Sequence, residues 1–206
     1  MKFFTPLFLI FSVLIAAFPL QAEQGTPYEP DFPLGLDPDV FTVPDDNPLT
    51  VEKIELGKML YFDKRISIDN TVSCATCHHP QKGFTDQLQF SKGFQAKTGD
   101  RNSPTVINSA FNYFQFWDGR APSLEEQAKG PMENPVEMAH TLDGAAQRIA
   151  SIKGYKPYFE AAFGDNQVTI DRMVKAIASY ERTVLSGNSP WDRYVYNGET
   201  TKLSSP

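Results

Sequence analysis

The segment Ser73-Cys74-Ala75-Thr76-Cys77-His78 decides how the rest of this sequence is interpreted. Its Cys-x-x-Cys-His spacing is typical of c-type haem attachment. Two thiols three positions apart on one helical turn can each bond a vinyl group of the same porphyrin, and the imidazole of the next residue can then reach the iron. The pattern therefore predicts one covalent haem c on Cys74 and Cys77, with His78 as the proximal iron ligand.

Three other uses of the two cysteines compete with haem attachment: a redox dithiol, a disulfide and half of a zinc site. A thioredoxin-like dithiol would be expected in a βαβ context, which the sequence does not suggest. A structural zinc site needs about four ligands, and the chain has only two cysteines. Haem attachment is the interpretation that we carry forward.

The sequence does not decide which residue, if any, binds the iron on the side opposite His78. His79 adjoins the proximal ligand, so we expect it at the surface, and His140 follows a proline-rich loop, where a solvated side chain is expected. Methionines are the other common ligands, although a methionine in an α-helical domain is usually part of the core. The methionines concerned are Met59, Met132, Met138 and Met173.

Composition favours a globular chain of ordinary size. The length of 206 residues is enough for one domain with tails. The proportions of hydrophobic residues (41%) and charged residues (21%) are those of a globular chain. Aromatic residues make up 13%, which suits either a pocket around a flat cofactor or an ordinary aromatic core. The formal charge is −6 and no basic stripe is present, so we do not expect a nucleic-acid partner.

The N-terminus predicts export. Residues 1–22 resemble a secretory signal peptide, with Lys2 at the start, an apolar run at 7–18 and a small residue, Ala22, at the expected cleavage point. An uncleaved membrane anchor is the alternative, but the apolar run is short for a span. Residues 23–48 are rich in Pro, Asp and Gly and predict an extended arm that lies over the domain or stays loose.

The remaining sequence predicts an all-α domain with long irregular loops. Capping residues and apolar spacing predict helices starting after Thr50 and after Thr169, the second ending at Gly187. We expect a helix from Ser103 through 111, and another from a capping box at Ser123 and Glu126. Further expectations are a short helix at 73–79, a loop at 80–101, breaks at Pro131 and Pro135, and helices at 142–152 and 157–163, the last stopped by Gly164.

Several segments in the same order give the chain a family resemblance. They are LGKMLYFD at 56–63, SCATCH at 73–78, GFTD at 83–86, RNSPT at 101–105, FWDGR at 116–120 and GPMENPVEM at 130–138. Residues 49–198 thus resemble the N-terminal haem domain of the bacterial di-haem cytochrome c peroxidases, a family that includes the methylamine-utilisation enzyme that matures a tryptophan-derived quinone. The resemblance implies a cytochrome c-like fold.

By this resemblance, Glu137 is the active-site glutamate, Gln127 and Pro131 shape the distal pocket, Trp117 lies on the electron path and Asn102 is a calcium ligand. A carboxylate beside the iron can move a proton between the two oxygens of peroxide. From the residues alone, Glu137 could equally be a loop glutamate, Gln127 an exposed helix residue and Trp117 a core aromatic.

Two departures from the family pattern matter. Many members have a histidine before the RNSPT segment that binds the resting iron, and here Phe94 matches that position, which implies an open iron site. The family also has a second Cys-x-x-Cys-His in a C-terminal domain, whereas this sequence has one such motif. We therefore interpret 199–206 as the start of a linker to a missing second haem domain, and the loss of the other calcium ligands argues against calcium binding.

The function implied is that of a periplasmic haem peroxidase domain that reduces hydrogen peroxide to water. Its electrons would come from a small donor protein such as a cytochrome c or a cupredoxin. A homodimer, or a separate polypeptide with the second haem, would complete it. The alternatives are a single-haem electron carrier, an inactive product of a shortened di-haem peroxidase gene, and a maturase acting on another protein.

Overall fold

The computed structural model describes residues 25–200 and residue 203. This part of the chain is helical and contains isolated β-bridges but no sheet, so the predicted all-α class is confirmed. The signal peptide predicted for 1–22 lies outside the described residues. No described helix is both long and apolar enough to cross a membrane. The helices are α1 (Val51–Phe62), α2 (Cys74–Cys77), α3 (Leu124–Glu133), α4 (Leu142–Ser151), α5 (Lys156–Phe163), α6 (Ile170–Glu181) and α7 (Pro190–Asn197).

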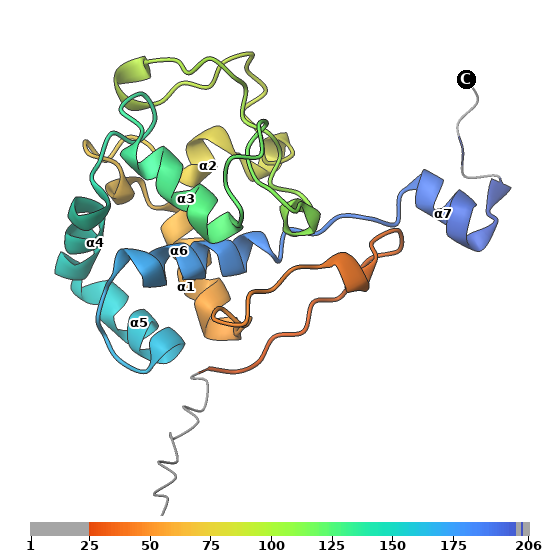
Figure 1. Cartoon of the computed structure of the whole chain (residues 1–206), viewed down its shortest axis with the longest axis horizontal. Coiled ribbons are helices and arrows are strands. Elements are labelled where there is room, and N and C mark those ends of the chain that lie inside the picture. Colours follow the sequence, from red (N-terminus) through yellow and green to blue (C-terminus); the bar gives the residue numbers. More distant parts are fainter. Residues whose placement is uncertain (1–24, 201–202, 204–206) are drawn as a thin grey trace, which may run out of the picture.

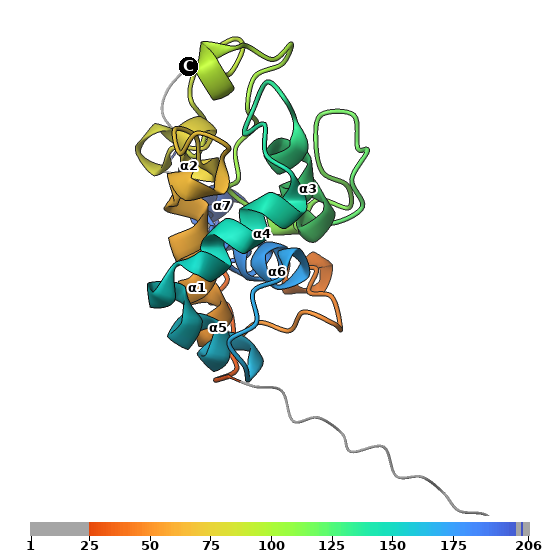
Figure 2. The same cartoon turned by 90° about the vertical axis from the view of Figure 1, so that its left-hand side faces the viewer.

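Helices α1 and α6 cross at the centre of the domain (Figures 1 and 2). The crossing depends on Gly57, because a side-chain carbon added there would collide with the backbone carbonyl of Ala176. Leu56 and Leu60 of α1 and Ile177 of α6 are fully buried at this contact. Helix α3 lies on one side of the pair, and α4 and α5 lie at the end away from α7 (Figure 1).

The predicted helix starts at Thr50, Ser123 and Thr169 are confirmed. Each side-chain oxygen accepts the backbone N–H three residues later, which satisfies a donor that the helix itself cannot pair. The capping box is only half formed, because the Glu126 carboxylate pairs with Lys129 instead. Helix α5 ends as predicted at Gly164, which adopts the left-handed conformation with φ +83°.

Three predicted helix boundaries are wrong: the start at Ser103, the break at Pro131 and the end of α6. Ser103 does not start a helix, because its hydroxyl bonds Ser91 and the carbonyl of Pro104 faces the His78 ring, so only a short 3-10 helix forms at Ser109–Phe111. Pro131 lies inside α3, which continues to Glu133.

Helix α6 ends at Glu181 rather than at Gly187. The chain leaves the helix there because the next residues bond other segments. The Val184 carbonyl accepts the Asn108 N–H at 2.9 Å, and the Ser186 N–H bonds the Asn108 side chain at 2.8 Å.

The N-terminal arm lies over the domain from residue 25 onward. Its backbone pairs Val51 with Thr26 at 2.9 Å, and further along Thr42 with Ala110 at 3.3 Å. A three-ring aromatic cluster of Phe32, Phe41 and Phe111 covers the second contact.

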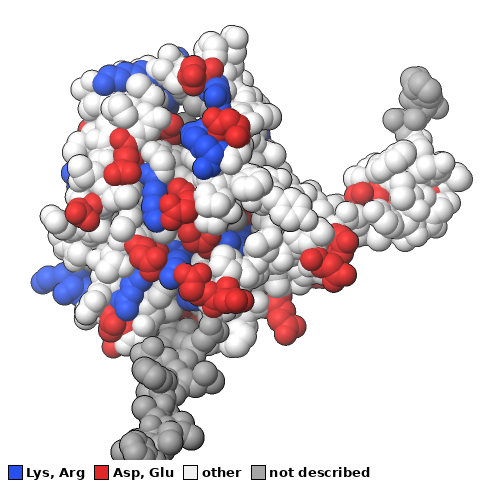
Figure 3. Space-filling model, in the orientation of Figure 1, with Lys and Arg blue, Asp and Glu red and all other residues white. Residues whose placement is uncertain are grey.

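Helix α7 was not anticipated from the sequence. Figure 1 shows it apart from the main body, and none of its residues is buried. A backbone bond from Asn188 to Leu34, at 2.6 Å, joins the segment before α7 to the arm. Acidic and basic side chains are interspersed over the face of the main body shown in Figure 3, so neighbouring charges there offset one another.

Candidate haem site

The short helix α2 presents the two cysteines and is fixed at both ends. At its start the Ser73 N–H bonds the Thr76 hydroxyl at 2.9 Å. At its end the Tyr61 hydroxyl of α1 donates to the carbonyl of His78 at 2.9 Å. Because Tyr61 is fully buried in the core, this bond ties the position of α2 to the crossing of α1 and α6.

The His78 ring is oriented by the backbone that follows it. Its Nδ1 lies 3.0 Å from the carbonyl oxygen of Pro104 and 3.3 Å from that of Phe84. Since a carbonyl can only accept, Nδ1 carries the proton and Nε2 keeps a lone pair. Desolvation lowers the pKa of His78, although both carbonyls oppose that shift. A neutral imidazole with a free Nε2 is the form that binds metals.

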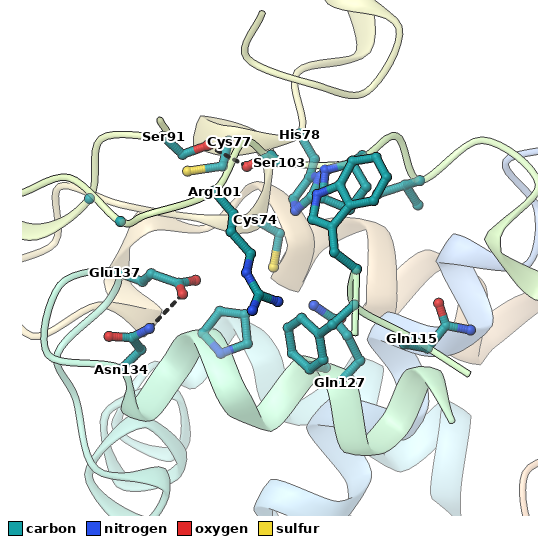
Figure 4. Close-up of a pocket in the computed structure, with 18 of the residues that line it drawn as sticks. Cys74, Cys77, His78, Ser91, Arg101, Ser103, Gln115, Gln127, Asn134 and Glu137 are labelled. Carbon is teal, nitrogen blue, oxygen red and sulfur yellow. Dashed lines mark hydrogen bonds between the residues drawn. The ribbon is translucent and has the colours of Figure 1, made fainter. Parts of the chain in front are cut away.

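A cavity of about 410 Å³ opens beside α2 and is lined by Cys74, Cys77 and His78. Its volume lies within the usual range for cofactor sites, roughly 300–1,000 Å³. In Figure 4, Glu137 and Asn134 lie at one end and Gln115 at the other, with Gln127 facing the cavity from α3. The two sulfurs and the imidazole share one cavity, so the residues present fit a haem held by two thioethers and an axial histidine.

The two thiols are not joined in a disulfide. Cys74 and Cys77 are free cysteines. Burial raises the pKa of the Cys74 thiol, and it raises that of Cys77 to about 11 with help from Asp86 and Glu137. Within the described part of the chain, no cluster of three or more His, Cys, Asp or Glu residues could hold a metal ion. A nucleophilic dithiol is disfavoured, because the thiolate is the reactive form.

The structure brings together all the predicted site residues. The lining includes Glu137, Gln127, Pro131, Trp117 and Asn102, which come from α3 and from three different loops. Their roles remain predictions, but their convergence on one cavity is a property of the fold.

Glu137 is half-buried and held from two sides. Asn134 donates its amide to the Glu137 carboxylate at 2.7 Å (Figure 4). The Phe94 N–H bonds the Glu137 carbonyl at 2.7 Å, and Gly93 allows this approach because a side chain there would meet the backbone of Val136. Burial raises the pKa of the Glu137 carboxyl, while Asn134 and the charge of Arg120 reduce the shift. Glu137 thus lies in a loop, as one interpretation of the sequence allowed, but it is partly buried and lines the cavity.

Trp117 lies at the cavity mouth, not in the core. It is 63% exposed, and its indole N–H donates to the carbonyl of Asn102 at 3.1 Å. Beside it, Asp118 pairs with both Arg101 and Arg120, each at 2.8 Å. The core-aromatic alternative for Trp117 is therefore wrong.

The residues weighed as sixth iron ligands have different positions. His140 is buried with 8% exposure, so its expected solvated position is wrong. Its backbone N–H donates to the carbonyl of Met132 in α3. His140 is not among the described residues that line the cavity. Met138 is buried and does line the cavity. Phe94 is outside the lining, and its ring lies under Lys97.

Other lining residues were missed from the sequence. Asn134 sits inside the quoted 130–138 segment without an assigned role. Glu181 had a detectable signal: the apolar residues Ile170, Val174 and Ile177 recur at helical spacing, and position 181 continues that spacing. A charged residue on the buried face of a helix is unusual and indicates a special environment.

Comparisons with known proteins agree with this geometry. The family model of the di-haem cytochrome c peroxidases matches residues 51–201. The cytochrome c551 peroxidase of Nitrosomonas europaea is 45% identical over 148 residues, covering 72% of this chain and 44% of that protein. The methylamine utilization protein MauG of Methylophilus methylotrophus is 41% identical over 162 residues, covering 79% and 48%.

A solved structure of a MauG-like protein associated with microbial copper homeostasis has the same fold. It superposes with a TM-score of 0.77 at 29% identity, covering 86% of this chain and 52% of that one. The fold is therefore cytochrome c-like, as expected. The chain spans about half the length of the relatives it matches. On these matches and on the haem-attachment geometry, the chain belongs to the di-haem cytochrome c peroxidase family.

Proposed function

We propose that this chain is an exported, periplasmic haem peroxidase domain that reduces hydrogen peroxide to water with electrons from an external donor. The observation that carries the proposal is the shared cavity: the haem-attachment residues and the half-buried Glu137 line the same space. The overall reaction is H₂O₂ + 2 H⁺ + 2 e⁻ → 2 H₂O. A haem bound through Cys74, Cys77 and His78 would supply the iron at which peroxide is reduced.

Glu137 moves the proton that this reaction has to relocate. With peroxide bound, the carboxylate would accept a proton from one peroxide oxygen and return it to the other, so that this second oxygen could leave as water when the O–O bond breaks. Its raised pKa brings the protonated and ionised forms closer in energy near neutral pH, which suits a group that must take and give a proton. Asn134 fixes one carboxylate oxygen by its hydrogen bond.

The other lining residues shape and supply the site. Gln127 projects from α3 and can hold peroxide or water by hydrogen bonding. Pro131, one turn further along α3, forms part of the same cavity wall and shapes it. The exposed indole of Trp117 gives electrons a route from the surface to the cavity. A small donor such as a cytochrome c or a cupredoxin is the expected partner, and a second haem on another segment or polypeptide would complete the family's pathway.

The test compares Glu137→Gln with Glu133→Gln in the haem-loaded protein. Glu133 is an exposed glutamate four residues away at the end of α3, so it controls for removal of a nearby charge. We expect Glu137→Gln to lower peroxide turnover by about 10²-fold or more, with haem content unchanged by absorbance, and Glu133→Gln to leave turnover unchanged. Equal turnover of Glu137→Gln and the wild type would remove the proton-transfer role.

A further inference from the structure

Two buried polar atoms in the cavity wall have no hydrogen-bond partner among the residues that the structure describes. They are Oγ of Ser109 and Oε2 of Glu181, whose residues are 6% and 5% exposed. Both residues line the cavity beside α2. Leaving a buried polar group without a hydrogen-bond partner destabilises a protein. Atoms of this kind in a cofactor cavity are expected to find their partner in the occupant.

The two residues belong to segments that are bonded to each other. The Asn108 N–H, adjacent to Ser109, donates to the carbonyl of Val184, three residues beyond Glu181, at 2.9 Å. Gln115, which also lines the cavity, donates its amide to the carbonyl of Ser109 at 3.2 Å. Ser109, Gln115 and Glu181 therefore form one polar section of the wall.

This section offers donors rather than charge. Burial raises the pKa of Glu181 to about 8, and Arg182 opposes the shift while Glu125 adds to it. The Arg182 guanidinium cannot neutralise Glu181 directly, since it is bonded to Glu125. The other titratable groups near Glu181 are its neighbour Tyr180 on α6, Tyr61 on α1 and Cys74 on α2. Burial therefore favours the protonated carboxylic acid of Glu181, a form that can donate a hydrogen bond as the serine hydroxyl does.

We propose that Ser109 and Glu181 form a donor pair that binds a carboxylate of the haem, one of its two propionates. Each side chain gives one hydrogen bond to the carboxylate oxygens, which satisfies both unpaired atoms at once. The inference rests on the haem of the proposed function but not on peroxide chemistry. The competing site is the pair Arg101 and Arg120, although both are exposed and already share Asp118.

The experiment measures the haem midpoint potential against pH by spectroelectrochemistry on the haem-loaded protein. The potential falls with rising pH as a nearby carboxyl ionises, because the negative charge favours the ferric state. Glu181→Gln removes the glutamate's own titration while keeping a donor, and Ser109→Ala is then added in that background. We expect the added change to move the remaining transition to higher pH by about one unit, because the ionised propionate loses a hydrogen bond.

The control is Ser179→Ala in the same background. Ser179 is a fully buried serine of α6 that bonds the Lys175 carbonyl and is not among the described lining residues. It should leave the profile unchanged. A profile unaffected by Ser109→Ala, or one moved instead by Arg101→Gln, overturns the inference. A wild-type chain without covalent haem contradicts the proposed function itself, so the two failures are distinguishable.

Discussion

The ion pair between Arg182 and Glu125 is the strongest test of how the structure holds α3 against α6. The Arg182 guanidinium is 2% exposed and bonds both carboxylate oxygens of Glu125, at 2.7 and 3.1 Å. It also bonds the carbonyl of Thr42 in the arm at 2.9 Å. The Asn47 amide is the other partner of the Glu125 carboxylate, at 2.7 Å. Removing the guanidinium therefore leaves a buried carboxylate with one neutral donor.

Arg182→Met keeps the length of the side chain and removes its charge. Breaking a buried pair from one side costs about 3–5 kcal/mol, because the remaining charge is left uncompensated. We expect that loss in the free energy of unfolding, measured by guanidinium denaturation of the haem-loaded protein at pH 7. Adding Glu125→Leu should recover most of it, since no unpaired charge then remains. Arg172→Met is the control: it breaks the more exposed pair with Asp165 and should cost less than about 1 kcal/mol.

The pH dependence gives a second check on the same pair. Burial alone would raise the pKa of Glu125, but the charge and hydrogen bonds of Arg182, together with the hydrogen bond from Asn47, outweigh burial, so the pKa lies below the ordinary value of 4.5. A carboxyl with a lowered folded-state pKa stabilises the fold above its unfolded pKa and loses that effect as pH falls through the folded value. The gap between wild type and Arg182→Met should therefore narrow in acid. A loss below about 1 kcal/mol at pH 7 would refute the reasoning.

Three further predictions concern other parts of the domain. Gly57→Ala should destabilise the haem-loaded protein by about 1–3 kcal/mol in the same denaturation assay, because α1 and α6 must separate to make room for the added methyl group. Gly154→Ala is the control and should have little effect, because the space around Gly154 is open. Equal stabilities of the two variants would contradict the close crossing. Asn134→Ala should raise the pKa of Glu137 further, because the carboxylate loses the hydrogen bond from Asn134. The acidic limb of the plot of peroxide turnover against pH should then move to higher pH. An unchanged plot would show that the hydrogen bond between Asn134 and Glu137 is unimportant. Trp117→Phe should slow peroxide turnover when a reduced protein supplies the electrons. The free energy of unfolding should change by less than about 0.5 kcal/mol, because the Trp117 side chain is exposed. Undiminished turnover would show that Trp117 is not on the electron route.

The parts of the fold that were predictable are those set by local chemistry. The caps at Thr50, Ser123 and Thr169 depend on a side chain and a backbone N–H three residues away, so the sequence contains both partners. The candidate haem-attachment motif was recognisable for the same reason, since both thiols and the imidazole fall within one short segment. The convergence of Glu137 and Gln127 on that motif required the family resemblance, because only the tertiary fold brings them together.

The features that escaped prediction depend on long-range contacts. Ser103 has the sequence of a helix start, but its hydroxyl and the next carbonyl bond partners 12 and 26 residues away. The expected end of α6 at Gly187 failed because the chain after Arg182 pairs with Asn108 and its surroundings. His140 was expected in solvent, but it is buried, its backbone N–H bonds the carbonyl of Met132 in α3, and its ring lies against Gly144 of α4. Local propensity cannot report such partners.

The most direct test of the account is the intact mass of the chain purified from cells equipped for cytochrome c maturation, measured after denaturation. The account predicts the polypeptide mass plus one haem, with the addition located by digestion on the peptide that contains Cys74 and Cys77. A Cys74→Ala, Cys77→Ala double variant should lose it, and His78→Ala should alter the absorption spectrum. A wild-type polypeptide whose mass includes no porphyrin, with both sulfurs unmodified, would contradict the central claim.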